Sequence, residues 1–177
     1  NFSYISLPNI GRESHTYLYH ICNNYNNLTD YTIFLQGDPF PHCHNTIKKI
    51  DELIQNPKDF EWITDRTIMT DFIGRLDPCN YQKFEVSYYA IFKKYPDIEN
   101  EIYEFGPGAQ FCVSKNTIHK RPLEFYKNIL NLFETTERNE LLDIIIWGEK
   151  NDHKGFSQER PVLSYHIERL WGLIFNV

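Results

Sequence analysis

The sequence has no concentrated positive charge. It holds 18 Lys and Arg against 24 Asp and Glu, which gives a formal net charge of −6 at pH 7, and only the short HKR segment at 119–121 exceeds two basic residues in a row. Proteins bind nucleic acid through a surface of clustered Lys and Arg, because every phosphate carries a negative charge. We therefore expect no nucleic-acid partner.

Long apolar runs are absent as well. None approaches the roughly 18 residues that a bilayer-spanning helix needs, and no charged segment followed by an apolar one indicates a signal peptide. We expect no transmembrane segment and a cytoplasmic location, with the secretory lumen as the alternative. The chain begins with Asn and its single methionine is Met69, so we expect it to be a trimmed part of a longer protein.

Several common site motifs are also missing. The four cysteines show no CxxC or zinc-finger spacing, so buried free thiols are expected in place of a disulfide framework or structural zinc. There is no G-x-S-x-G motif, and serine-hydrolase chemistry has little support. No GxGxxG or GxxxxGK loop is present to bind phosphate.

What is present is enough for one domain over residues 1–177, with 41% hydrophobic and 16% aromatic residues. The segments 2–7 and 31–36 are typical of strands, the second of a strand buried on both faces, and 109–114 is a third strand. Helical spacing predicts helices over 12–26, 45–56, 121–136 and 162–175. Residues 57–100 fit strands, loops or a helix. The alternation favours an α/β fold with a mainly parallel sheet flanked by helices.

Polar residues follow two of these strands. In open α/β sheets, ligands bind beyond the carboxyl ends of the strands. The strand 2–7 ends at PNIGRESH and the strand 31–36 ends at GDPFPHCH. If the two strands are parallel neighbours, one rim gathers the polar side chains of both loops, namely Arg12, Glu13, His15, Asp38, His42 and His44.

Each of these side chains has a functional and a structural interpretation. Asp38 fits a ligand of Mg²⁺ or Mn²⁺, or a turn-forming residue in G-D-P. His42, with Cys43 and His44, offers a transition-metal set with Asp38, although hydrogen bonding to the site or to backbone is favoured. Arg12 begins a helix, where it could bind a phosphate, or it forms a surface ion pair with Glu13.

Two later segments are further candidates. FGPGAQF at 105–111 places Gly108 and Gln110 before a strand, either as a tight turn or as a wall of the substrate pocket. HIERLW at 166–171 carries Glu168, a candidate general base, and Trp171, which could stack on a sugar. The alternative for that helix is a Glu–Arg surface pair with Trp171 in the core.

The segments 7–43, 104–130 and 166–175, which contain GRESHTYL, FLQGDPF, FGPGAQF and ERLW, resemble an uncharacterised domain family of fungi, bacteria and large viruses. The same order of features is similar, more distantly, to glycosyltransferases of the rhamnan-synthesis type. That group has an N-x-G-R-D segment before a helix, an acidic turn after a strand, a G-x-x-F strand and a closing E-R-L. Arg12 and Glu13 match the first feature and Asp38 the second, while Gly108–Phe111 and Glu168–Leu170 match the others.

This second resemblance implies a GT-A fold with a nucleotide-binding α/β sheet, and a divalent metal, Mn²⁺ or Mg²⁺, at the acidic turn. It also implies that an N-terminal strand precedes the printed chain. The chain departs from the pattern in two places, with Glu13 where the group has Asp and Q-G-D-P in place of D-x-D.

We expect a glycosyltransferase that moves a sugar from a nucleotide sugar to a glycan or another hydroxyl acceptor. The alternatives are a non-catalytic carbohydrate-binding module and a metal-dependent hydrolase built on Asp38, His42 and His44. In the transferase, Asp38 and Glu168 are the catalytic candidates, and Asp38 and His42 the metal ligands. The residues expected to bind substrate are Arg12, Glu13, His15, Gln36, Gly108, Gln110 and Trp171.

Overall fold

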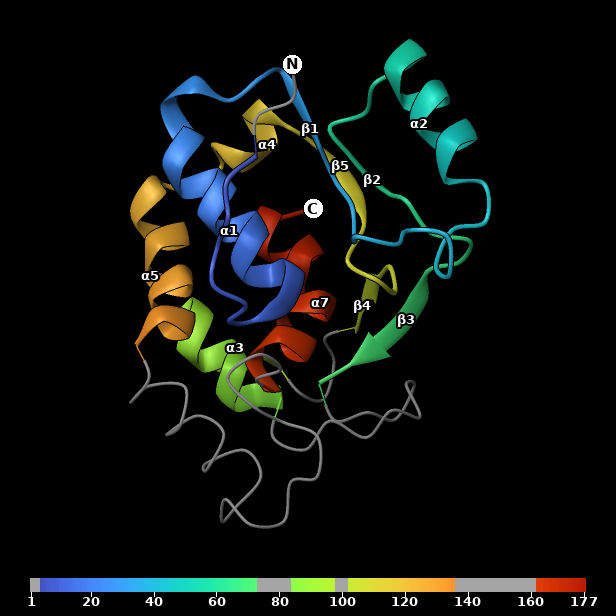
Figure 1. The fold of residues 1–177 in the computed structure, drawn as a ribbon. Helices are drawn as coiled ribbons and strands as arrows, with labels where there is room; N and C mark the ends of the chain where they lie inside the picture. Colours follow the sequence, from blue (N-terminus) through green and yellow to red (C-terminus); the bar gives the residue numbers. More distant parts are fainter. Residues whose placement is uncertain (1–3, 73–83, 98–101, 136–161) are drawn as a thin grey trace.

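The computed structural model describes residues 4–72, 84–97, 102–135 and 162–177 (Figure 1). In these ranges the chain forms helices and strands that are mixed along the sequence. The helices are α1 (Arg12–Asn24), the 3₁₀ turn η1 (Tyr25–Asn27), α2 (Thr46–Gln55), α3 (Phe84–Phe92), α4 (Lys115–Ile118), α5 (Leu123–Glu134) and α7 (Val162–Phe175). The strands are β1 (Tyr31–Phe34), β2 (Phe60–Trp62), β3 (Ile68–Asp71), β4 (Ile102–Phe105) and β5 (Phe111–Ser114).

The strands form two small antiparallel sheets. One has the order β1-β5-β2, with Phe34 opposite Phe111 and Trp62 opposite the same residue, and the other pairs β3 with β4. The mixed α/β class is confirmed, but the prediction of a mainly parallel sheet is wrong for the described residues. An alternation of strands and helices does not fix strand direction, and here β5 enters between β1 and β2 in the opposite sense.

The strand predicted at 2–7 is not formed by the described residues 4–7, where Tyr4 is 92% and Ile5 74% exposed. An alternating pattern needs a neighbouring strand to pair with and a core to cover, and this segment has neither. The strand at 31–36 is confirmed over Tyr31–Phe34 but lies at the edge of its sheet. Only Phe34 of its four residues is buried, whereas all four residues of the central strand β5 are buried.

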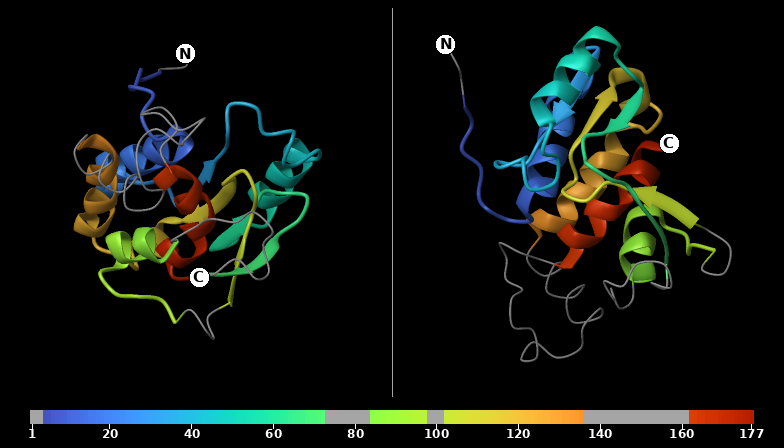
Figure 2. Two further views of the ribbon diagram at one scale, coloured as in Figure 1. Left: turned by 90° about the horizontal axis from the view of Figure 1, so that it is seen from below. Right: turned by 90° about the vertical axis from the view of Figure 1, so that its right-hand side faces the viewer.

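Helices cover both faces of the larger sheet. Figures 1 and 2 show α1, α5 and α7 on one side and α2 on the other. Phe111 and Val113 of β5 join the main core with residues of α1 and α7, while Cys112 faces the opposite way and packs with Leu53 of α2 and Ile63. The period-two alternation of side chains along β5 thus holds the two helical layers together.

Several expectations about helices and cysteines agree with the described residues, although Cys22 is only partly buried. The helix predicted at 162–175 is confirmed as α7, and 45–56 and 121–136 contain α2 and α5. Cys22, Cys43 and Cys112 are free thiols, and Cys79 lies outside the described ranges. None of the helices in the described part of the chain has the length and apolar content needed to cross a bilayer. The segments 139–150 and 151–161 lie outside the described residues.

Candidate functional site

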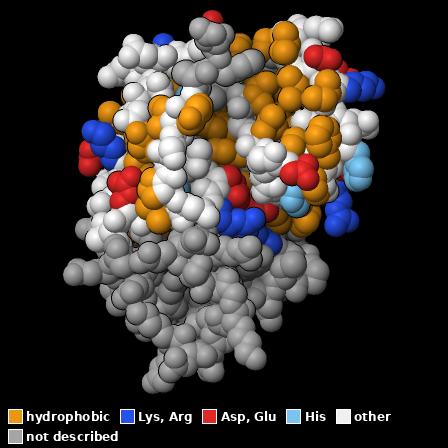
Figure 3. All heavy atoms as spheres, viewed as in Figure 1, with side chains coloured by type: hydrophobic (Ala, Val, Ile, Leu, Met, Phe, Trp, Pro, Cys, Tyr) orange, Lys and Arg blue, Asp and Glu red, His pale blue; other side chains and the backbone are white. Residues whose placement is uncertain are grey.

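A polar groove of about 590 Å³ lies between the start of α1 and the loop that follows β1. Acidic and basic side chains gather near the centre of the face seen in Figure 3, next to a band of hydrophobic ones. Four residues proposed from the sequence line the groove together: Arg12, Glu13, Gln36 and Asp38. The other lining residues are Asn9, Thr16, Tyr17, Leu35 and Gly37.

The backbone at the start of α1 sets the direction of Arg12. Gly11 and Arg12 both have positive φ, 82° and 55°, which is unusual for a residue with a side chain. A Cβ on Gly11 would lie 2.4 Å from a ring carbon of Phe133, so only glycine fits against α5. The turn leaves the Arg12 guanidinium 4.9 Å from the centre of the Tyr165 ring and its Nε 3.6 Å from Glu13 Oε2.

Glu13 is the most unusual carboxyl group of the groove. Its side chain is only 11% exposed, and its Oε1 has no hydrogen-bond partner among the described residues. Burial raises the pKa of this carboxyl, and the nearby carboxylate of Glu168 raises it further. The backbone N–H of Glu13, the charge of Arg12 and the Gln36 side chain lower the pKa in part. A buried carboxyl with a free oxygen is suited to accept a proton.

Tyr17 lies one helical turn after Glu13 and was not proposed from the sequence. Tyr17 is one of the residues that line the groove and is 4% exposed, and its buried hydroxyl has no hydrogen-bond partner in the described structure. Burial raises the pKa of the Tyr17 hydroxyl, with smaller effects from Glu13 and Glu168. The sequence signal that could have found it is the i, i+4 spacing from Glu13, which places the two side chains on one face of α1.

Glu168 of α7 belongs to the same neighbourhood although it follows Glu13 by 155 residues in the chain. It is close enough to raise the pKa of both Glu13 and Tyr17. Its Oε1 accepts a 2.8 Å hydrogen bond from the backbone N–H of Gly108. Glu168 therefore has one oxygen committed to the turn before β5.

Gly108 and Gln110 shape the loops around the groove and do not line it. Gly108 has a φ of 88°, and a Cβ there would lie 2.6 Å from Cγ of His42. Gln110 is fully buried. Its Nε2 donates to the carbonyls of Pro39 (3.1 Å) and Ile63 (3.3 Å), and its Oε1 accepts from the backbone N–H of Gln36 (3.4 Å). Gln110, which was expected in the wall of the substrate pocket, thus links the loops after β1 and β2 inside the protein.

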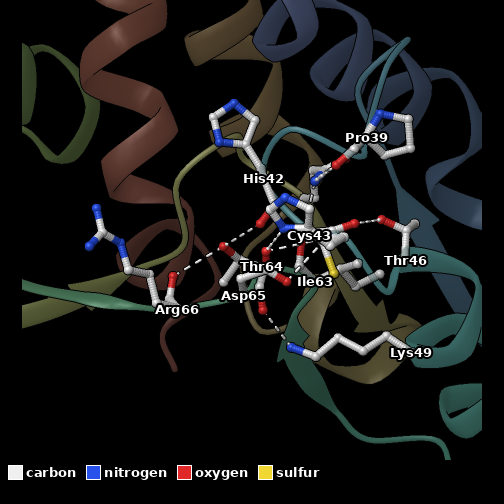
Figure 4. Close-up of polar contacts among 11 residues, drawn as sticks. Pro39, His42, Cys43, Thr46, Lys49, Ile63, Thr64, Asp65 and Arg66 are labelled. Carbon is white, nitrogen blue, oxygen red and sulfur yellow. Dashed lines mark hydrogen bonds and ion pairs between the residues drawn. The ribbon is translucent and has the colours of Figure 1, made fainter.

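The loop after β1 is also fixed to the loop after β2 through the 42–46 segment (Figure 4). The Thr64 hydroxyl donates to the carbonyl of His42 at 3.1 Å, and the Lys49 ammonium donates to the carbonyl of Thr64 at 2.7 Å. His44 pairs with Asp65 through both its ring and its backbone N–H. His42 is thus held through its backbone carbonyl, and the His44 ring pairs with Asp65.

Two other proposed residues lie away from the groove. The His15 ring is buried between α1 and α5, 3.4 Å from Glu134 Oε1. Trp171 is fully buried and packs on Tyr17 and Phe111, as in the core interpretation of its helix. An amphipathic pattern cannot separate a core tryptophan from one that stacks on a ligand, because both require an apolar neighbourhood.

The divalent metal implied by the resemblance has no complete ligand set in the described ranges. No group of three or more His, Cys, Asp and Glu side chains there has a metal-binding arrangement. Asp38 is exposed, and its Oδ1 accepts from the backbone N–H of Phe40 at 3.4 Å, as a turn-forming Asp does. We therefore derive no chemical step through a metal.

The chain was compared with known families. Residues 3–65 match the family model described as "Protein of unknown function (DUF3431)". No curated protein and no solved structure matches the chain. Every residue that lines the groove lies inside the matched segment, whereas Gly108 and Glu168 lie outside it.

Proposed function

We propose that the groove binds a nucleotide sugar and that the protein transfers the sugar to a hydroxyl acceptor. The observation that carries this proposal is the meeting of Arg12, Glu13, Gln36 and Asp38 in one groove. A cation and several carboxyl groups around one cavity suit a reaction in which a diphosphate leaves and a hydroxyl loses its proton.

The sheet supports a ligand at this edge, although it is antiparallel. β1 and β2 both run opposite to β5, so their carboxyl ends meet the amino end of β5 at the same edge. Gln110 ties the loops at that edge together. A site built on linked loops keeps its geometry without a ligand, and binding then requires less ordering.

The roles follow from charge and position. Arg12 would hold the diphosphate, because its guanidinium donates paired hydrogen bonds to phosphate oxygens at the start of a helix. Gln36 and Asp38 would contact the donor sugar at the groove rim. One of the two carboxyls, Glu13 or Glu168, would take the proton of the acceptor.

The proposal is tested by measuring the thermal stability of the purified protein with UDP, GDP, CMP and dTDP, each with and without Mn²⁺. A nucleotide at about 100 times its dissociation constant should stabilise the fold by roughly 2.7 kcal/mol, which corresponds to about 5–10 °C for a chain of this size. Calorimetric titration then gives the affinity. Release of the nucleotide from the matching nucleotide sugar, a nucleoside diphosphate or, for a CMP-sugar, CMP, tests turnover.

Two variants locate the site. Arg12→Gln should weaken nucleotide binding about 10–100-fold, because a hydrogen bond to a charged group contributes about 1.5–3 kcal/mol. Asp38→Asn tests the rim, with Asp51→Asn on the exposed face of α2 as the matched control. If no nucleotide binds, the transferase proposal fails, and binding of glycosides alone would instead support the carbohydrate-binding module.

A further inference from the structure

We infer that Glu13 and Tyr17 form a subsite for a single ligand hydroxyl, and that this hydroxyl is the acceptor of the transfer reaction. The inference rests on the proposed function for its second half only. Its basis is a pair of buried polar atoms that belong to residues lining one groove and have no partner among the described residues, Oε1 of Glu13 and the hydroxyl of Tyr17.

Unpartnered polar atoms are costly in a folded protein. More than nine in ten buried polar groups have a hydrogen-bond partner, because losing water without replacing it is unfavourable. Tyr17 is 4% exposed and Glu13 has 11% of its side chain exposed, so bulk solvent compensates neither fully. Two such atoms on consecutive turns of α1, in residues that line the same cavity, indicate that a ligand supplies the missing contacts.

The charges around the pair select a neutral ligand group. Arg12 Nε lies 3.6 Å from Glu13 Oε2 and disfavours a second cation. Glu13 and the nearby Glu168 both disfavour an anion. The ligand atom must donate a hydrogen bond to Glu13 Oε1 and can accept one from the Tyr17 hydroxyl. A hydroxyl does both at one oxygen, whereas an amide divides donor and acceptor between two atoms.

The same arrangement assigns the base. In the transfer step the acceptor oxygen attacks the anomeric carbon of the donor and forms the new C–O bond. Its proton moves to Oε1 of Glu13, and the bond from the anomeric carbon to the diphosphate breaks with its electron pair leaving on the diphosphate. Glu13 suits this role better than Glu168, because Glu13 is one of the residues that line the groove and Glu168 is not. The raised pKa of Glu13 makes it a stronger base than an ordinary carboxylate.

The first test is binding of simple glycosides to the full chain. The probes are the methyl glycosides of glucose, galactose, mannose and rhamnose, followed by saturation-transfer NMR and titration. We expect at least one to bind, and Tyr17→Phe to weaken it about tenfold, the size of one hydrogen bond. Glu13→Gln should weaken it at least as much. Tyr126→Phe is the matched control, because its hydroxyl donates to the carbonyl of Ile118 away from the groove.

The nucleotide titration separates the two proposals. Tyr17→Phe should leave nucleotide affinity within about twofold of the starting protein, while Glu13→Gln should lower turnover of the matching donor by about 10²–10⁴-fold, as expected for loss of a general base. Nucleotide binding without glycoside binding would overturn the hydroxyl subsite and leave the transferase standing. Glycoside binding that depends on Tyr17, without nucleotide binding, would support the hydroxyl subsite and overturn the transferase proposal. Glycoside binding that is unchanged in Tyr17→Phe also overturns the inference.

Discussion

Two buried tyrosines of the main core offer a direct test of the hydrogen-bond assignment at the groove. Tyr17 and Tyr126 are 4% and 0% exposed, and both pack against aromatic rings. The hydroxyl of Tyr126 donates to the carbonyl of Ile118 at 2.8 Å, whereas the hydroxyl of Tyr17 has no partner in the described structure. Replacing Tyr126 by Phe therefore removes a hydrogen-bonded hydroxyl, whereas replacing Tyr17 by Phe removes one without a described partner.

The expected effects have opposite signs. A satisfied buried hydrogen bond contributes about 0.5–1.5 kcal/mol, so Tyr126→Phe should lower the free energy of unfolding by about 1 kcal/mol. An unsatisfied buried hydroxyl is unfavourable by about 1–3 kcal/mol, so Tyr17→Phe should raise the free energy of unfolding by about 1 kcal/mol. The two variants should therefore differ by about 2 kcal/mol, or about 4–8 °C in melting temperature.

Urea unfolding followed by tryptophan fluorescence measures both variants against the starting protein. The dependence of stability on urea should be equal in all three proteins, so that differences in midpoint report stability. A loss of about 1 kcal/mol or more in Tyr17→Phe would show that its hydroxyl is hydrogen-bonded in the free protein. That result would refute the reasoning, and the hydroxyl subsite would lose its main support.

Two other predictions concern groups at the same edge of the sheet. The pKa of Glu13 is raised above 4.5 by burial first, and also by Glu168, so its contribution to stability is present below that pH and is lost as the pH rises through the folded-state pKa. Urea unfolding over about pH 4–8 should show this loss of stability in the starting protein and not in Glu13→Gln. If the free energy of unfolding of the two proteins changes with pH in parallel, the raised pKa of Glu13 is contradicted. Gly108→Ala should destabilise by about 1–3 kcal/mol because of its positive φ and the His42 ring. Gly37→Ala is the control: no atom lies near the new Cβ, so its free energy of unfolding should stay within about 0.5 kcal/mol of the starting protein. Equal melting temperatures for the Gly108→Ala and Gly37→Ala variants would exclude strain at Gly108.

The helices could be predicted from the sequence because their signals are local. α7 was predicted with its observed bounds, since its apolar residues repeat with the helical period and a whole turn of them is buried. The same reasoning failed for residues 2–7, which alternate as a strand does. Alternation is a property of the segment's own sequence. Whether another strand lies beside it depends on the tertiary structure.

The sheet could not be predicted in direction or order for the same reason. β1 and β5 are separated by α2, β2, β3, α3 and β4 in the chain, yet they are neighbours. The buried run at 31–36 fitted a central strand by its composition, but β5 takes that place and leaves Tyr31 exposed. The composition of a segment shows how apolar that strand is. Its position in the sheet also depends on the other strands, because the central position goes to the strand that is apolar on both faces.

The candidate site could be predicted from the sequence only in part. Arg12, Glu13 and Asp38 were proposed because each follows a predicted strand or begins a helix, and Gln36 is the last residue of the strand predicted at 31–36. The structure brings the four residues into one groove. Their meeting did not require the parallel sheet from which it was predicted, because the carboxyl end of β1 alone brings 35–38 beside the start of α1. Tyr17 was missed because a tyrosine at helical spacing fits the core equally well. Tyr17 belongs to the core and is also one of the residues that line the groove, and only the absence of a described partner for its buried hydroxyl separates the two roles.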